Sequence, residues 1–243
     1  RWYSGAGLYR PVWIHIQEKD YIEPEGVKIR TCSVNPAQIE VTTEHQGGEI
    51  EVYIIKDGEV TAGGNGDRVL LDIPDAQLWS DETPVLYTAR VTLKKDGSEI
   101  ETVEEEFGIR KVTWDGNGLY VNGKKSLLRG GCIHHDNGIL GACTYDESEE
   151  RKIRILKENG FNAVRCAHNP CSKALLRACD RIGMYVMDET WDMWYRKKSQ
   201  YDYANEFEDH YRDDIQAIVQ RDYNHPSVIM YSIGNEVSEP SEK

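Results

Sequence analysis

The chain has 243 residues, of which 39% are hydrophobic and 29% are charged. This length suits one large domain or two ordinary ones, and the composition excludes a disulfide-stapled mini-protein, a collagen-like chain and a disordered tail. Asp and Glu number 42 against 29 Lys and Arg, so the net charge is −13. Phosphate-backbone binding needs clustered positive charge, and a membrane helix needs about 20 apolar residues in a run. We therefore predict neither nucleic-acid nor membrane partners.

Residues 27–107 are predicted to form antiparallel β-structure. Apolar and polar residues alternate, or nearly so, in 27–34, 38–43 and 86–93. The pairs Asp57-Gly58 and Asp96-Gly97 are typical of hairpin turns between such strands. Short strands with turns about every 8–12 residues favour an immunoglobulin-like β-sandwich.

Beyond residue 126 apolar strands alternate with helices. We predict strands at 127–131, 161–165, 184–187 and 228–233, and helices at 144–160, 172–182 and 205–223. The first helix is expected to open with a capping box, Thr144-x-x-Glu147. Strands that are continuously apolar indicate a parallel sheet buried on both faces, either open and doubly wound or a (β/α)₈ barrel. A whole barrel takes about 250 residues, so the chain has room for its first half, about four strands.

Polar and ionisable residues follow each of these strands, and barrels build active sites from the carboxyl ends of their strands. A carboxyl group at that edge, such as Glu236, is expected to be partly desolvated and suited to donating a proton. Asn235 beside it can donate a hydrogen bond to a substrate hydroxyl. The groups in question are His134-His135-Asp136, Arg165 to His168, Asp188-Glu189 and Asn235-Glu236.

Each candidate also has a structural alternative. Asn235 and Glu236 could be a solvated loop pair, and His168 could be a satisfied structural histidine. The cluster of His134, His135 and Asp136 could bind zinc, but no known ligand spacing such as H-E-x-x-H is present. We therefore predict no metal ligands.

The six cysteines contain no C-x-x-C pair. We interpret them as reduced core thiols, which favours a reducing, cytoplasmic compartment. The chain begins at Arg1, without an initiator methionine or a signal peptide, and we expect it to be a fragment.

Six motifs follow one another along the chain: Ser4 to Arg10, Phe107-Gly108-Ile109-Arg110, Leu119 to Lys124, Leu128-Arg129-Gly130, Arg165 to Pro170 and Gly234-Asn235-Glu236. In this order and spacing they resemble glycoside hydrolase family 2, the family of β-galactosidases, β-glucuronidases and β-mannosidases. The resemblance implies the carboxyl end of a jelly-roll sugar-binding domain in residues 1–19, an immunoglobulin-like sandwich in 20–110 and the first half of a TIM-barrel catalytic domain in 111–243.

The resemblance also implies roles for individual residues. Glu236 matches the family's acid/base glutamate, and Asn235 matches the residue that contacts the sugar 2-hydroxyl. Arg165 matches the arginine that braces the nucleophile. His134 and His168 match sugar-contacting histidines.

The family is retaining, so a second glutamate, about 5–5.5 Å from the first, attacks the anomeric carbon. The resemblance places it on barrel strand seven, which we expect to lie beyond Lys243, so we expect this chain alone to be inactive. A terminal β-galactoside is the expected substrate of the parent exo-glycosidase. β-Glucuronidase, β-mannosidase, a non-catalytic carbohydrate-binding module and a histidine-based metallohydrolase are the alternatives.

The sequence departs from well-known β-galactosidases after the third strand, where they carry metal-binding carboxylate and histidine residues. Here the chain reads Asp188-Glu189-Thr190-Trp191-Asp192-Met193-Trp194, which favours neither the magnesium nor the sodium found in the family. We predict that Asp192 contacts a sugar hydroxyl. Trp191 and Trp194 form either a sugar-stacking wall or core packing. This pattern is similar to a β-galactosidase-like subgroup of gut bacteria. The unpaired sheet edges of half a barrel predict a homo-oligomer.

Overall fold

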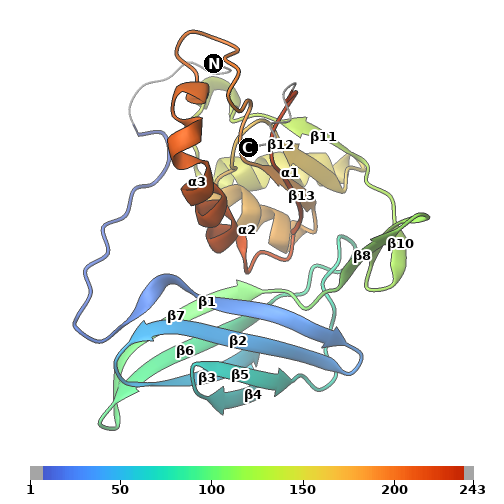
Figure 1. The fold of residues 1–243 in the computed structure, drawn as a ribbon. Helices are drawn as coiled ribbons and strands as arrows, with labels where there is room; N and C mark the ends of the chain where they lie inside the picture. Colours follow the sequence, from blue (N-terminus) through green and yellow to red (C-terminus); the bar gives the residue numbers. More distant parts are fainter. Residues whose placement is uncertain (1–7, 238–243) are drawn as a thin grey trace. The chain divides into compact units, whose positions relative to one another are not determined.

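The computed structural model describes residues 8–237. Residues 1–7, the first part of the predicted end of a jelly-roll domain (1–19), lie outside this range. The described chain divides into two compact units (Figure 1). One contains residues 13–127 and 223–226, and the other contains residues 8–12, 128–222 and 227–237.

The first unit contains a β-sandwich, as predicted. One sheet has the strand order β1-β2-β5 and the other has the order β4-β3-β6-β7, and all neighbouring strands are antiparallel. Apolar side chains from both sheets, including Ile39, Val52 and Leu93, form one buried core. The strands are β1 (Tyr21–Val34), β2 (Ala37–Gln46), β3 (Glu49–Lys56), β4 (Glu59–Asn65), β5 (Arg68–Asp72), β6 (Tyr87–Lys95) and β7 (Ser98–Phe107).

The two predicted hairpin turns are confirmed. Asp57 and Gly58 have φ angles of 50° and 84°, and Asp96 and Gly97 have 51° and 78°. Positive φ at both central residues is the geometry of a type I′ turn, whose twist matches that of the flanking strands. These turns set the registers of β3 with β4 and of β6 with β7.

A small antiparallel meander follows, made of β8 (Val112–Asp115), β9 (Gly118–Val121) and β10 (Lys124–Ser126). The strand predicted at 127–131 begins three residues later than expected, as β11 (Gly130–Ile133). Leu127 and Leu128 are exposed, and pairing with the next strand starts only at Gly130. The apolar leucine pair therefore misplaced this boundary.

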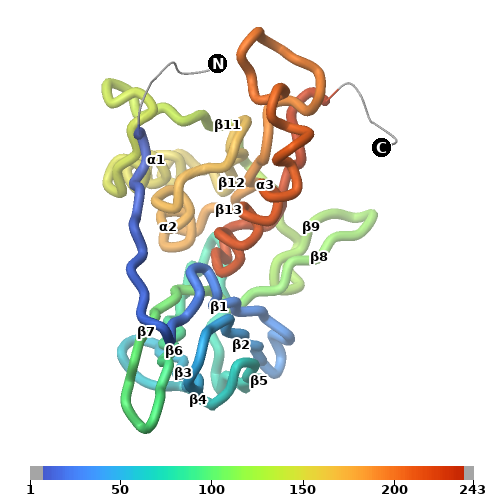
Figure 2. The backbone as a smooth tube through the Cα atoms, turned by 60° about the vertical axis from the view of Figure 1, so that its left-hand side comes forward, coloured from blue at the N-terminus to red at the C-terminus, as the bar shows by residue number. Residues whose placement is uncertain are grey.

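The second unit contains a parallel sheet with the order β11-β12-β13-β14. Helices connect its strands, and Figure 2 follows the chain through this alternation. Ile153, Leu176, Met184 and Val186 lie in its buried core. The remaining elements are α1 (Asp146–Glu158), β12 (Ala163–Cys166), α2 (Lys173–Ile182), β13 (Tyr185–Glu189), α3 (Phe207–Asp222) and β14 (Val228–Ser232). This arrangement confirms the first strands of a TIM barrel.

The capping box of α1 is formed by other residues than the predicted Thr144 and Glu147, since the N-cap is Tyr145 and the third helical residue is Ser148. The helix starts at Asp146, so Thr144 lies outside it, and the Ser148 hydroxyl accepts a hydrogen bond from the Tyr145 N–H at 3.3 Å. Three acidic residues occupy the first turn, where the helix dipole favours negative charge. No helix in residues 8–237 is long and apolar enough to cross a membrane.

The cysteines are free thiols, but the core interpretation holds for only some of them. Cys166, Cys171 and Cys179 are buried, whereas Cys32 and Cys132 are exposed. The exposed pair lies on strands, where every second side chain faces away from the core.

Helix α2 starts one residue later than predicted and ends at the predicted residue, and both of its ends are capped locally. The Ser172 hydroxyl accepts a hydrogen bond from the Leu175 N–H at 3.1 Å. Gly183 ends the helix at a φ of 82°, which a residue without a side chain adopts at little cost.

Replacing Ser172 with alanine is expected to lower the free energy of unfolding by about 1 kcal/mol, because an orphan N–H loses its acceptor. Urea denaturation of the variant measures this change. Ser199→Ala is the control, since exposed Ser199 contacts Asp202 through its backbone N–H. An equal effect of both substitutions would contradict the capping role.

Candidate active site

The carboxyl ends of the parallel strands bring the predicted site residues to one edge of the sheet. Arg165 lies on β12, and His168 lies two residues beyond that strand. Glu189 is the last residue of β13, while Asn235 and Glu236 follow β14. The structure thus gathers residues separated by up to 71 positions in the sequence, as the alternating pattern predicts.

The Glu189 carboxylate is the centre of this edge, and it is completely buried. One of its oxygens accepts hydrogen bonds from Arg165 Nε at 2.8 Å, Arg165 Nη2 at 2.5 Å and Ser232 Oγ at 2.6 Å. The other lies 2.7 Å from His168 Nδ1. A buried carboxylate is tolerated only when it is paired and hydrogen-bonded in this way.

Asn235 is fixed by the same network. Its side-chain oxygen accepts a hydrogen bond from Arg165 Nη2 at 3.1 Å, and its amide nitrogen donates to Asp192 Oδ1 at 3.0 Å. Its backbone N–H donates to the Trp191 carbonyl at 3.1 Å. Both Asn235 and Asp192 are buried. The orientation of the Asn235 side chain is therefore determined on both sides.

Lys198 lies on the other side of Asp192 and connects it to Glu236. Its ammonium nitrogen is 2.8 Å from Asp192 Oδ1, 3.1 Å from the Asn235 carbonyl and 3.4 Å from Glu236 Oε2. The Glu236 side chain is 76% exposed. The expectation that Glu236 is partly desolvated is therefore wrong in the described structure. Glu236 lies four residues beyond the end of β14, on a turn, rather than against the sheet.

The turn before Glu236 depends on a close approach at Gly234. A β-carbon on Gly234 would lie 2.6 Å from Val237 and 2.9 Å from the indole nitrogen of Trp194. That same indole N–H donates to the Ile233 carbonyl at 2.7 Å. This hydrogen bond and the close contact at Gly234 stabilise the turn that carries Asn235 and Glu236.

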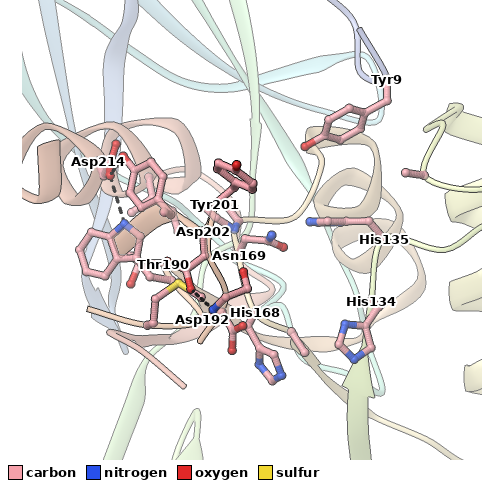
Figure 3. Close-up of a pocket in the computed structure, with 18 of the residues that line it drawn as sticks. Tyr9, His134, His135, His168, Asn169, Thr190, Asp192, Tyr201, Asp202 and Asp214 are labelled. Atoms are coloured by element: carbon pink, nitrogen blue, oxygen red, sulfur yellow. Dashed lines mark hydrogen bonds between the residues drawn. The ribbon is translucent and has the colours of Figure 1, made fainter. Parts of the chain in front are cut away.

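A cavity of about 1050 Å³ adjoins the network within the same unit. Its wall includes four predicted site residues, and Figure 3 shows three of them labelled, His134, His168 and Asp192, with tyrosines at its margin. His134 meets His168 edge-on, with ring centroids 5.4 Å apart. Arg165, Asn235 and Glu236 are not among the residues that line this cavity.

Trp191 is the fourth predicted residue in the cavity wall, and it is only 6% exposed. Its ring packs edge-on against Phe207 at 4.9 Å, and its indole N–H donates to Asp214 at 3.1 Å. These contacts show that Trp191 packs in the wall of the cavity. Its contact with a substrate stays a prediction.

Sequence reasoning listed Glu189 at its strand end but gave it no role, and it missed Ser232 and Lys198. The available indication for Glu189 was a carboxylate ending an apolar strand, where burial demands partners. The indication for Lys198 was the length of the connection between β13 and α3, since long irregular loops in compact domains often carry function.

The residues at this edge do not fit a magnesium site. Magnesium needs carboxylate ligands, and both Asp192 and Glu236 face the Lys198 ammonium, a competing cation. Cys166, Cys171 and Asp188 place three possible ligand atoms within 4.8 Å of one another. Asp188 is already paired with Arg221 at 2.8 Å and accepts the Cys171 N–H at 3.1 Å. A metal there would have to displace these partners.

His135 is held by Arg10 beside the cavity. Arg10 Nη2 lies 3.0 Å from His135 Nδ1 and donates to the Pro170 carbonyl at 2.9 Å. Burial, together with the Arg10 charge, lowers the pKa of His135 to about 4. This histidine is therefore neutral at physiological pH and acts as a hydrogen-bonding partner rather than a cation.

Comparison with known proteins agrees with this geometry. The family model "Glycosyl hydrolases family 2, TIM barrel domain" matches residues 112–242, and the model "Glycosyl hydrolases family 2" matches residues 26–110. A β-sandwich followed along the chain by the first strands of a parallel barrel is the domain order that these two family models describe. The chain belongs to glycosyl hydrolase family 2.

Individual relatives support the same assignment. The chain is 36% identical to the beta-galactosidase BoGH2A of Bacteroides ovatus, over 98% of this chain and 31% of that protein. A solved family 2 structure from Bacteroides cellulosilyticus is 39% identical, with a TM-score of 0.93, over 98% of this chain and 34% of that one. The beta-D-glucuronidase of Dictyoglomus thermophilum is 25% identical, with a TM-score of 0.81, over 92% and 40%. The chain thus spans about a third of the length of its relatives.

Replacing Glu189 with glutamine is expected to lower the free energy of unfolding by about 3 kcal/mol, because the Arg165 charge loses its buried partner. Urea denaturation measures the change. Glu150→Gln is the matched control, since its exposed i,i+4 pair with Arg154 contributes less than about 1 kcal/mol. Equal losses in the two variants would contradict the central role of Glu189.

The depressed pKa of His135 predicts a pH-dependent stability. The unfolded chain protonates His135 near pH 6.5 and the folded chain only near 4, so its stabilising effect is complete above 6.5 and is lost as pH falls toward 4. The full effect is at most about 3 kcal/mol. His135→Gln is expected to reduce the difference in unfolding free energy between pH 4.5 and 7, whereas exposed His210→Gln leaves it unchanged. A difference equal to that of the parent chain would contradict this origin.

Proposed function

We propose that this chain supplies the acid/base part of the active site of a retaining exo-β-glycosidase that hydrolyses terminal β-galactosides. One observation carries the proposal. Glu236 directly follows Asn235, whose side chain is buried and held by both Arg165 and Asp192 at the carboxyl edge of the sheet. A solvent-accessible carboxyl beside a fixed amide has the arrangement needed to act on one bond of a bound sugar.

In the proposed mechanism Glu236 has two successive tasks. It first donates a proton to the glycosidic oxygen as the aglycone leaves, and it then takes a proton from the water that releases the sugar. Its 76% exposure leaves the carboxyl open to both the leaving group and water. The second carboxylate, the nucleophile, is proposed to come from outside residues 1–243.

Asn235 and Arg165 support these steps from the buried side. A side-chain amide has two N–H donors, and the bond to Asp192 uses one of them, which leaves one for a sugar hydroxyl. Arg165 fixes Asn235 and holds its guanidinium at the edge of the sheet through Glu189. We assign it the bracing of the nucleophile. His134, His168 and Asp192 line the adjoining cavity and are assigned to contacts with sugar hydroxyls.

Galactose is the proposed sugar because the curated relative at 36% identity is named a beta-galactosidase. A β-glucuronide is the second candidate, since a glucuronidase structure shares the fold at 25% identity. A non-catalytic carbohydrate-binding module is the alternative from a different class.

Hydrolysis of aryl β-galactoside, β-glucuronide, β-mannoside and β-glucoside by the full-length gene product tests the proposal. We expect the galactoside to be cleaved fastest. Glu236→Gln is expected to lower kcat/KM about 10²–10⁴-fold for a phenyl glycoside, the usual contribution of general acid catalysis. Exposed Glu208→Gln on α3 is the control and is expected to have no effect.

Two results would overturn parts of the proposal. Undiminished hydrolysis by the Glu236 variant would remove its acid/base role. Sugar binding without turnover of any glycoside by the full-length protein would favour the carbohydrate-binding module. The 243-residue chain alone is expected to be inactive in the same assay.

A further inference from the structure

The ammonium group of Lys198 has all three of its donors engaged. Its partners are Asp192 Oδ1 at 2.8 Å, the Asn235 carbonyl at 3.1 Å and Glu236 Oε2 at 3.4 Å. An ammonium carries three N–H groups, so this set is complete. Lys198 therefore has no spare donor for a substrate carboxylate, and its charge is directed at the residues already assigned to the site.

The three contacts differ in how firmly they are held. The side chains of Lys198 and Asp192 are 18% and 10% exposed, whereas that of Glu236 is 76% exposed. Screening by water weakens exposed pairs more than buried ones. Asp192 and the Asn235 carbonyl thus fix the position of the cation from the buried side. Glu236 is the exposed partner, at the longest of the three distances.

The backbone around Lys198 is also fixed. The N–H groups of Lys198 and Ser199 donate to Asp202 Oδ2 at 2.6 and 2.7 Å, and the Ala204 N–H donates to Asp202 Oδ1 at 3.1 Å. Three hydrogen bonds to the Asp202 carboxylate close a tight loop that begins at Lys198. The side chain consequently starts from a defined backbone position, although it lies in a long connection.

We propose that Lys198 is a positioning residue for Glu236, an inference that rests on the acid/base role assigned above. Its ammonium orients the Glu236 carboxyl and stabilises the charge that forms there. In the first step Glu236 gives its proton to the glycosidic oxygen, the bond from the anomeric carbon to the aglycone breaks, and the nucleophile carboxylate, proposed above to come from outside residues 1–243, bonds to that carbon. The Glu236 carboxylate then remains beside Lys198. In the second step water bonds to the anomeric carbon, the nucleophile carboxylate is released, and Glu236 takes up a proton from that water. Lys198 keeps its own protons throughout.

The choice of lysine follows from the geometry of the three acceptors. They belong to a carboxylate, a backbone carbonyl and a second carboxylate, and a compact ammonium with rotatable donors can serve all three. The planar fork of arginine suits one bidentate carboxylate instead. A conservative Lys198→Arg variant therefore keeps the charge but only part of the geometry, whereas Lys198→Met keeps the side-chain length without the charge.

The dependence on the leaving group separates positioning from a structural effect. In the full-length protein, kcat/KM is measured for dinitrophenyl and phenyl β-galactosides, or for the same pair built on whichever sugar the wild type cleaves. Only the poor phenolate leaving group needs strong proton donation. We expect Lys198→Met to lower kcat/KM for the phenyl glycoside about tenfold or more, within the range of general acid catalysis, and to change the dinitrophenyl value far less. Lys198→Arg is expected to restore part of the loss.

Exposed Lys197→Met is the matched control and is expected to behave as the wild type. Equal losses on both substrates, or no loss on either, would overturn the proposal. If Lys198→Met does not fold, the ratio of the two kcat/KM values in Lys198→Arg decides, and an unchanged ratio overturns the proposal. A wild type that cleaves no glycoside refutes the proposed function and this inference together. An active wild type with an impaired Glu236→Gln variant and unselective Lys198 variants refutes this inference alone.

Discussion

The site depends on one buried carboxylate. Glu189 is completely excluded from water, so its charge must be balanced inside the protein, and the partners come from three different segments: Arg165 on β12, His168 in the loop beyond it and Ser232 on β14. Removing a carboxylate from water costs several kcal/mol, and only correctly placed partners offset that cost. The loops that carry the candidate catalytic residues are therefore tied to one point of the sheet, and a strand displaced from its position would leave a buried charge uncompensated.

Along this network the site residues become more exposed from Glu189 through Lys198 to Glu236. Arg165 donates a hydrogen bond to the Asn235 side chain. Asn235 in turn donates to Asp192 through its amide and accepts from the Lys198 ammonium through its backbone carbonyl. Glu236 comes last, with most of its side chain in water and one long contact to Lys198. This change from a buried Asn235 to an exposed Glu236 fits the acid/base role proposed above. A group that binds a hydroxyl must be held in place, whereas a group that transfers a proton must reach both a leaving oxygen and a water. The buried network fixes the position of Asn235, and the exposed Glu236 carboxyl is open to substrate and water.

Local features of the fold could be predicted from the sequence, whereas the partners inside the site could not. The Asp-Gly hairpins, the Ser172 and Gly183 caps of α2 and the strand–helix alternation are encoded within a few residues. The start of β11 was misplaced because two exposed leucines resembled a buried strand. Glu189 and Ser232 lie 43 positions apart, and Lys198 and Glu236 lie 38 apart. No local pattern joins such pairs, because three-dimensional pairing of strand ends brings them together. The predicted burial of Glu236 failed for a related reason, since the turn beyond β14 carries it away from the sheet.

The two cations of the site have different tasks, and their chemistry explains the division. Arg165 donates to one oxygen of a buried carboxylate with two nitrogens of its planar fork and to the Asn235 side-chain oxygen with one of the same nitrogens, so it binds two oxygens through three hydrogen bonds. Lys198 meets three acceptors around a point charge, one of which belongs to the proposed acid/base residue Glu236. A planar fork suits the buried interior, and an ammonium with rotatable donors can contact the buried Asp192 and the exposed Glu236 together. Because Asp192 and Glu236 share this ammonium, the charge that faces the proposed acid/base group belongs to the chain itself. Its presence at the site therefore follows from folding, with no separate binding equilibrium.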